Sequence, residues 1–159
     1  MDRSSGQKGN RSLASLLRAA RHTYSLAIRA PLADAGFEDI PRDGVFVIAA
    51  IRTGDVSAGD LQRRLGVSKQ AVSQLLDTLV LRGYVERSIH TEDRRRMTLT
   101  LTRRGERVAT VCRRAVDQVE QRIVEIVGTS YVEHTRATLT ALIELAAEWQ
   151  PDTPSLTGR

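Results

Sequence analysis

The apolar positions in the middle of the chain first follow the spacing of a helix and then the spacing of a strand. Leu61 and Leu65 lie four residues apart and predict a short helix over Ser57–Leu65. A longer stripe at the same spacing predicts a second helix over Ser68–Arg82. The members of that stripe are Val72, Leu75, Leu76 and Leu79.

The residue types at the ends of these two helices support their boundaries. Ser57 and Ser68 can cap the helix N-termini, because a serine hydroxyl accepts a hydrogen bond from a free backbone N–H group. Asp60 suits the positive end of the first helix, and Gly66 can end that helix in a left-handed conformation. The Gly66-Val67 turn therefore joins two helices into a helix-turn-helix.

After the second helix the apolar residues alternate with polar ones, which predicts two strands. The first strand is Tyr84–Ile89 and the second is Met97–Thr102, where Leu99 and Leu101 repeat the period of two. A charged loop, His90–Arg96, lies between them. A helix-turn-helix followed by a β-hairpin is a winged helix, which most often binds DNA.

Polar residues of the second helix gather opposite its apolar stripe. They are short or amide side chains around one lysine, which are types that contact base edges and phosphates. The candidates for DNA contact are Ser68, Lys69, Gln70, Ser73 and Gln74, and Asp77 shares their face. An ordinary solvated helix face has the same appearance, so the helix alone leaves both interpretations open.

The loop of the hairpin contains three consecutive arginines, Arg94, Arg95 and Arg96. Their mutual repulsion is costly unless a polyanion lies nearby, so we expect contacts with DNA. Asp93 can support the wing by accepting hydrogen bonds from the turn or by bracing an arginine. A solvated loop is the alternative, and His90 is open between a phosphate contact and a solvated position.

Ser57–Gly105 resembles the DNA-binding core of the MarR family of bacterial transcriptional regulators. The family's wing motif, D-x-R, three residues and L-x-L-T-x-x-G, is matched completely by Asp93–Gly105. Leu75–Val85 also resembles the end of the family's recognition helix, and a weaker resemblance covers about residues 10–149. The resemblance implies that the second helix enters the major groove and that Arg95 enters the minor groove.

Further apolar stripes flank this core. They predict a helix over Arg11–Leu32 and another over Pro41–Arg52, with Pro41 in its first turn. The buried side of the latter is expected to hold Phe46, Val47, Ala50 and Ile51. After the core, one helix runs to Val127, Gly128 breaks it, and a last helix follows over Ser130–Trp149.

The winged helix, at residues 41–105, cannot cover the stripes of the outer helices. We therefore expect residues 11–34 and 106–149 to form dimerisation helices across a two-fold axis, as the MarR resemblance also implies. A monomer whose ends pack together is the alternative. Residues 1–10 are expected to be disordered and residues 150–159 to form a flexible tail. The predicted fold class is mainly α with a small β-hairpin wing (α+β).

The net charge of +5 is unevenly distributed. Residues 1–81 carry +3, residues 82–114 carry +6, and residues 115–159 carry −4. The positive excess therefore lies on the wing and the start of the next helix. A phosphate-binding surface requires this kind of asymmetry.

Other functions find little support in the sequence. His22, His90 and His134 lack metal-ligand spacing, and no catalytic or phosphate-cradling motif occurs, so we expect no enzyme activity and no cofactor. No apolar run approaches 18 residues, and the N-terminus lacks a signal-peptide pattern, which favours a cytoplasmic protein with no membrane contact. Cys112 occupies an apolar-stripe position, which favours a buried thiol over a redox sensor.

These features predict a dimeric, sequence-specific transcriptional regulator, a repressor released from an inverted-repeat DNA operator by a small molecule. The resemblance implies a small aromatic effector between the dimer helices and the reader domain, where Tyr24 and Phe46 are candidates. Core packing is the alternative role for both residues. The alternative function is a protein-interaction or non-specific DNA-binding module without a dedicated operator.

Overall fold

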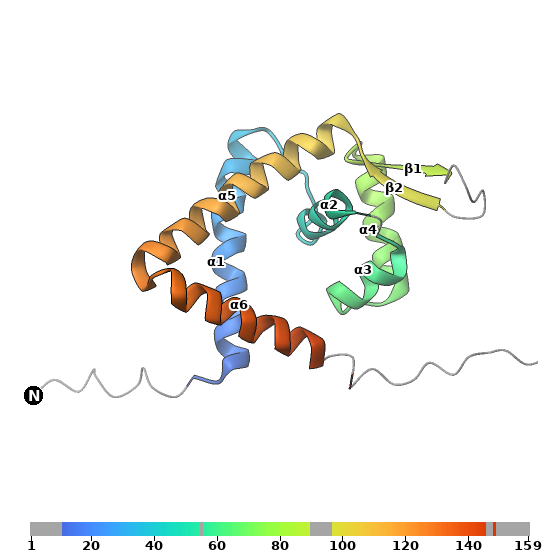
Figure 1. Ribbon diagram of the computed structural model, residues 1–159. Coiled ribbons are helices and arrows are strands. Elements are labelled where there is room, and N and C mark those ends of the chain that lie inside the picture. The colour runs from blue at the N-terminus through green and yellow to red at the C-terminus, as the bar shows by residue number, and fades with distance from the viewer. Residues whose placement is uncertain (1–10, 55, 90–96, 146–147, 149–159) are drawn as a thin grey trace, which may run out of the picture. The chain divides into compact units, whose positions relative to one another are not determined.

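The computed structural model describes residues 11–54, 56–89, 97–145 and 148, and the chain divides into two compact units, Met1–Asp117 and Gln118–Arg159. The elements, labelled in Figure 1, are α1 (Leu13–Asp34), α2 (Gly44–Thr53), α3 (Ala58–Leu65), α4 (Lys69–Leu81), β1 (Val85–Ile89), β2 (Met97–Leu101), α5 (Arg103–Val127) and α6 (Thr129–Glu144). The predicted fold class, mainly helical with a two-stranded hairpin, is confirmed. The terminal segments 1–10 and 150–159 lie outside the described residues.

The start of α2 differs from the prediction. The helix begins at Gly44, three residues after Pro41, whose carbonyl accepts a hydrogen bond from the Gly44 N–H group at 2.8 Å. Gly44 is buried so closely that an added Cβ would lie 3.0 Å from Leu79 and 3.2 Å from the Pro41 ring. Proline therefore forms the turn that enters the helix, and the packing of Gly44 sets the helix start.

The buried side of α2 also differs from the prediction, because Ile48 is buried instead of Phe46, and Ala50 is half-buried. Val47, Ile48 and Ile51 are buried, but Phe46 is 38% exposed. The apolar sequence GVFVIAAI allows either face to be the inner one, so the spacing did not decide where the aromatic ring lies.

The helix-turn-helix forms as the sequence predicts. Ser57 and Asp60 make a reciprocal capping box at the start of α3, and Gly66 ends this helix in the left-handed conformation with φ of 65°. The Ser68 hydroxyl caps α4 by accepting from the Ala71 N–H group at 3.2 Å. The buried stripe of α4 consists of Val72, Leu76 and Leu79.

The wing begins where α4 ends. Gly83 adopts φ of 69°, and the Tyr84 N–H group donates to the Leu79 carbonyl at 2.9 Å, so the helix closes with a left-handed residue and the chain turns into β1. The two strands are antiparallel and pair Val85 with Leu101 at the wing root. The predicted strands are therefore confirmed.

The second unit contains the end of α5 and all of α6. Gly128, with φ of 88°, separates the two helices as predicted, and Arg136 forms an ion pair with Glu120 between them. No described residue of α6 is buried. The helix ends at Glu144, whereas the predicted end, Trp149, lies outside the described residues.

Candidate nucleic-acid interface

The outer face of α4 presents a row of polar side chains. Ser68, Lys69, Gln70, Ser73 and Gln74 are all exposed. The Gln70 and Gln74 amides form no hydrogen bond with any described residue. These amides are therefore available to pair with groups outside the chain.

Asp77, on the same face, is already paired within the chain. Its carboxylate accepts a hydrogen bond from Arg87 of β1 at 2.6 Å. Both side chains are exposed to water, so the pair adds little stability. Its position links α4 to the first strand of the hairpin, and we regard it as a connection between the two candidate DNA-contacting parts.

The tip of the wing falls outside the described residues. This applies to His90, Asp93, Arg94, Arg95 and Arg96. The root of the wing is described, and it explains the second half of the sequence motif. The Thr102 hydroxyl donates to the Gly83 carbonyl at 2.6 Å and accepts from the Gly105 N–H group at 3.1 Å, so it joins the end of α4 to the start of α5.

A polar cluster that the sequence analysis did not anticipate lies beside the wing root. Tyr84 donates a hydrogen bond to Asp39, and Arg104 donates to the Asp39 carboxylate and to the Tyr84 hydroxyl oxygen, both at 2.9 Å. The Arg104 guanidinium also lies 4.6 Å from the centre of the Tyr84 ring. We call Asp39, Tyr84 and Arg104 the wing-root cluster.

Burial and charge hold the cluster in a defined protonation state. The hydrogen bond from Tyr84 and the nearby Arg104 charge lower the pKa of Asp39. Burial, followed by the hydrogen bond to Asp39, raises the pKa of Tyr84. At neutral pH the aspartate is therefore ionised and the tyrosine is protonated, which is the combination that the hydrogen bond requires. A buried tyrosine calls for a polar partner, but the sequence does not indicate which residue supplies it.

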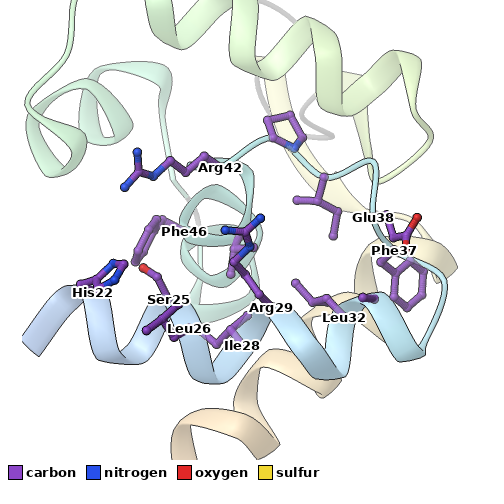
Figure 2. A pocket seen from close by; sticks show the side chains of 14 residues that line it. His22, Ser25, Leu26, Ile28, Arg29, Leu32, Phe37, Glu38, Arg42 and Phe46 are labelled. Atoms are coloured by element: carbon purple, nitrogen blue, oxygen red, sulfur yellow. The ribbon is translucent and has the colours of Figure 1, made fainter.

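A pocket of about 630 Å³ lies between α1, the α1–α2 loop and the start of α2 (Figure 2). Phe46 and Phe37 lie at opposite ends of it, and Arg29 and Arg42 contribute guanidinium groups to its lining. Apolar side chains such as Leu32 supply much of the remaining wall. Such a pocket suits a ligand with an apolar body and a polar or charged group.

A second pocket of about 450 Å³ shares one wall with the first. Phe46 lines both, and Arg21 covers its ring at 5.1 Å while pairing with Asp43 at 3.2 Å. Tyr24, the other effector candidate, is half-buried and lines neither described pocket. Of the two candidates, Phe46 therefore lines these two pockets and Tyr24 does not.

Cys112 is buried in α5, as the stripe position indicates, and burial raises the pKa of its thiol to about 11. Because the thiolate is the reactive form, we expect iodoacetamide to modify folded protein at pH 7.5 far more slowly than protein in denaturant. Mass spectrometry over time measures both rates. Equal rates would show that the thiol is accessible and reactive.

Metal-binding and membrane-spanning features are absent from the described part of the chain. No group of three or more histidine, cysteine, aspartate or glutamate side chains there could hold a metal ion. None of the described helices has both the length and the apolar character needed to cross a membrane.

The sequence model of the MarR family matches residues 40–96, which include α2, α3, α4 and β1. The comparison with curated proteins gave no match. Among solved structures, FabT of Streptococcus pneumoniae in complex with DNA is 22% identical, with 86% of this chain and 96% of that chain covered and a TM-score of 0.69.

Two further solved structures have the same fold. Apo MarR of E. coli is 22% identical, with 84% of this chain and 98% of that chain covered and a TM-score of 0.61. MepR of S. aureus bound to ethidium bromide is 20% identical, with 84% and 96% covered and a TM-score of 0.55.

These findings confirm the fold that the sequence predicts, and the match over residues 40–96 supports the predicted resemblance to the MarR family. MarR family regulators are DNA-binding transcription factors and not enzymes, which agrees with the predicted lack of catalytic function. The winged helix of this chain matches the MarR family model across residues 40–96, and the chain has the fold of a MarR family transcription regulator.

Proposed function

We propose that this protein is a homodimeric, sequence-specific DNA-binding regulator, which represses transcription from an inverted-repeat operator and leaves the operator when a small molecule binds. The observation that carries this proposal is the exposed polar face of α4 beside the two-stranded hairpin. Glutamine amides on an exposed helix can read adenine edges in the major groove. The FabT structure, a protein of the same fold bound to DNA, supports this use of the surface.

Each part of this surface has a separate role in the proposal. Gln70 and Gln74 read bases in the major groove, and Ser68, Lys69 and Ser73 contact the backbone or base edges beside them. Arg95 enters the minor groove, where groove width is read, while Arg94 and Arg96 neutralise phosphates. Asp93 supports the wing. The excess of +6 over residues 82–114 favours a polyanion at this surface.

Gln74→Ala should lower the affinity for operator DNA while leaving the affinity for random DNA nearly unchanged. A glutamine that forms two hydrogen bonds with adenine contributes about 1–3 kcal/mol of discrimination, and the variant removes it from both subunits. Fluorescence anisotropy with a promoter duplex and a random duplex measures the difference in binding free energy between the two. A wild-type protein that binds the two duplexes equally would favour the non-specific module.

Arg94→Ala is the matched contrast, because an arginine that pairs with phosphate carries no base information. It should weaken binding to both duplexes. The slope of log K against log salt concentration should fall in magnitude by about 0.9 for each phosphate that is no longer neutralised, and a dimer doubles this effect. Wing variants that leave both affinity and slope unchanged would show that the wing does not contact DNA.

The effector, in this proposal, binds in the larger pocket. Its aromatic body would pack against Phe46, and its acidic group would pair with Arg29 or Arg42. The ethidium complex of MepR supports the idea that this fold accommodates an aromatic ligand. By linkage, a ligand that favours a DNA-incompetent arrangement of the dimer lowers DNA affinity.

Phe46→Ala should weaken the binding of a confirmed inducer about tenfold or more, which corresponds to about 1.4 kcal/mol. Inducers can be found among small aromatic carboxylates by their effect on DNA anisotropy, and calorimetry then measures their affinity for the free protein. Tyr24→Phe is the control and should leave this affinity unchanged. An inducer whose affinity survives both Phe46→Ala and Arg29→Gln in folded protein binds elsewhere.

A further inference from the structure

The α1–α2 loop has one face on the larger pocket and the other on the wing root. Phe37, Glu38 and Ile40 line the pocket, whereas Asp39, between them in the sequence, belongs to the wing-root cluster. The loop is also anchored at its start, where the Phe37 N–H group donates to the Leu32 carbonyl at 2.8 Å. A displacement of the pocket-facing residues must therefore change the position of the Asp39 carboxylate.

Phe37 contacts both sites directly. It lines the pocket, and only 5% of it is exposed. Its ring lies edge-on to Tyr84, with centres 6.3 Å apart, and the Arg104 and Arg107 guanidinium groups lie 5.9 Å and 5.3 Å from its centre. Because the ring packs tightly between these groups, it cannot move without changing its contacts on the wing side.

The wing-root cluster is in turn fixed to both strands of the hairpin. Tyr84 is completely buried and directly precedes β1. Its carbonyl accepts a hydrogen bond from the Thr102 N–H group, just after β2, at 3.1 Å. The orientation of the hairpin therefore depends on where Tyr84 is held, and Asp39 and Arg104 are the polar groups that hold its hydroxyl.

We propose that the wing-root cluster couples the pocket to the wing, so that a ligand pressing on the α1–α2 loop reorients the hairpin and lowers DNA affinity. This inference rests on the proposed function, since it requires that the wing contacts DNA. Asp39, Tyr84 and Arg104 are then positioning residues, because they act on DNA only through the hairpin. Coupling is reciprocal, so DNA on the wing must also change the surroundings of Phe37.

The reciprocal effect can be measured without knowing the ligand. The chain contains two phenylalanines, so incorporation of 4-fluorophenylalanine gives one fluorine resonance for Phe37 and one for Phe46. We expect a saturating promoter duplex to shift the Phe37 resonance of the otherwise unaltered protein. In Asp39→Asn and in Tyr84→Phe most of this shift should disappear, although anisotropy shows that the duplex is bound. The variant that combines Asp39→Asn and Tyr84→Phe should show little further reduction of the shift, since both changes disrupt the same hydrogen-bonded cluster.

Asp43→Asn is the matched control. It removes another carboxylate near the same loop, one that pairs with Arg21 at 3.2 Å and lies outside the wing-root cluster, so the DNA-induced shift should persist. Folded Asp39→Asn and Tyr84→Phe proteins that retain the full shift would overturn the coupling, as would a saturated wild-type complex with no shift at Phe37. Absence of duplex binding by the wild type would instead refute the proposed function, and the coupling with it.

Discussion

Replacement of Gly105 by alanine should destabilise the protein by about 3 kcal/mol or more, despite the higher helix propensity of alanine. A Cβ atom at this position would lie 2.1 Å from the Tyr84 carbonyl oxygen and 3.3 Å from Leu101. The carbonyl cannot retreat freely, because it accepts the Thr102 N–H group at the end of the hairpin. Relief of the clash must therefore separate α5 from the wing root. Thermal unfolding should show a decrease of about 6–12 °C in Tm.

Gly59→Ala provides the matched control within a helix. Gly59 lies in α3, and among the described residues an added Cβ would meet Ser57 Oγ at 3.7 Å and Arg63 Nη1 at 3.8 Å and nothing closer. Since these are ordinary van der Waals distances, alanine should be neutral or should stabilise by about 0.4–1 kcal/mol. If Gly105→Ala is as stable as Gly59→Ala, the wing root accommodates the added methyl group without loss of stability, and Gly105 has no steric role.

The wing motif also shows which constraints were readable in the sequence. Gly105 makes room for the Tyr84 carbonyl across the hairpin, whereas the threonine of L-T-x-x-G has a local role, because Thr102 caps α5. Gly83 likewise ends α4 with a left-handed conformation. Capping interactions of this kind act between residues close in sequence, so they leave a fixed spacing. The helix-turn-helix, the hairpin and the breaks at Gly66 and Gly128 could be predicted for the same reason.

The features that escaped prediction depend on contacts between distant residues. Asp39 meets Tyr84 from 45 positions away and Arg104 from 65 positions away, and no periodicity connects them. Phe46 lies in an almost wholly apolar helix, where only the packing of neighbouring elements decides which side chain is covered. The start of α2 depends on the close packing of Gly44 against Leu79. Spacing alone carries no information about such contacts.

Large apolar side chains on the outer helices are exposed to solvent, and the second prediction concerns what covers them. Ile126, Tyr131 and Ile143 of the second unit are 68%, 73% and 73% exposed, and in the first unit Leu13 of α1 is 51% exposed. We propose that a second copy of the chain covers these surfaces, because a soluble monomer seldom exposes so much large apolar surface. The dimer would then place two α4 helices about one DNA turn, roughly 34 Å, apart.

Leu142→Asp should therefore weaken dimerisation by several kcal/mol, because it buries an unpaired carboxylate in the proposed contact and does so in both subunits. Each 1.4 kcal/mol raises the dimer dissociation constant about tenfold, so sedimentation at micromolar concentration should show mainly monomer. The affinity for operator DNA should fall as the dimer dissociates, since one subunit binds only one half-site.

Thr140→Asp is the control. It adds the same charge at an exposed position of the same helix and should leave the dimer intact. A stable, folded monomer of the unaltered protein at micromolar concentration would refute the dimer. A Leu142→Asp protein that dimerises as well as the unaltered protein would show that Leu142 of α6 does not lie in the dimer contact.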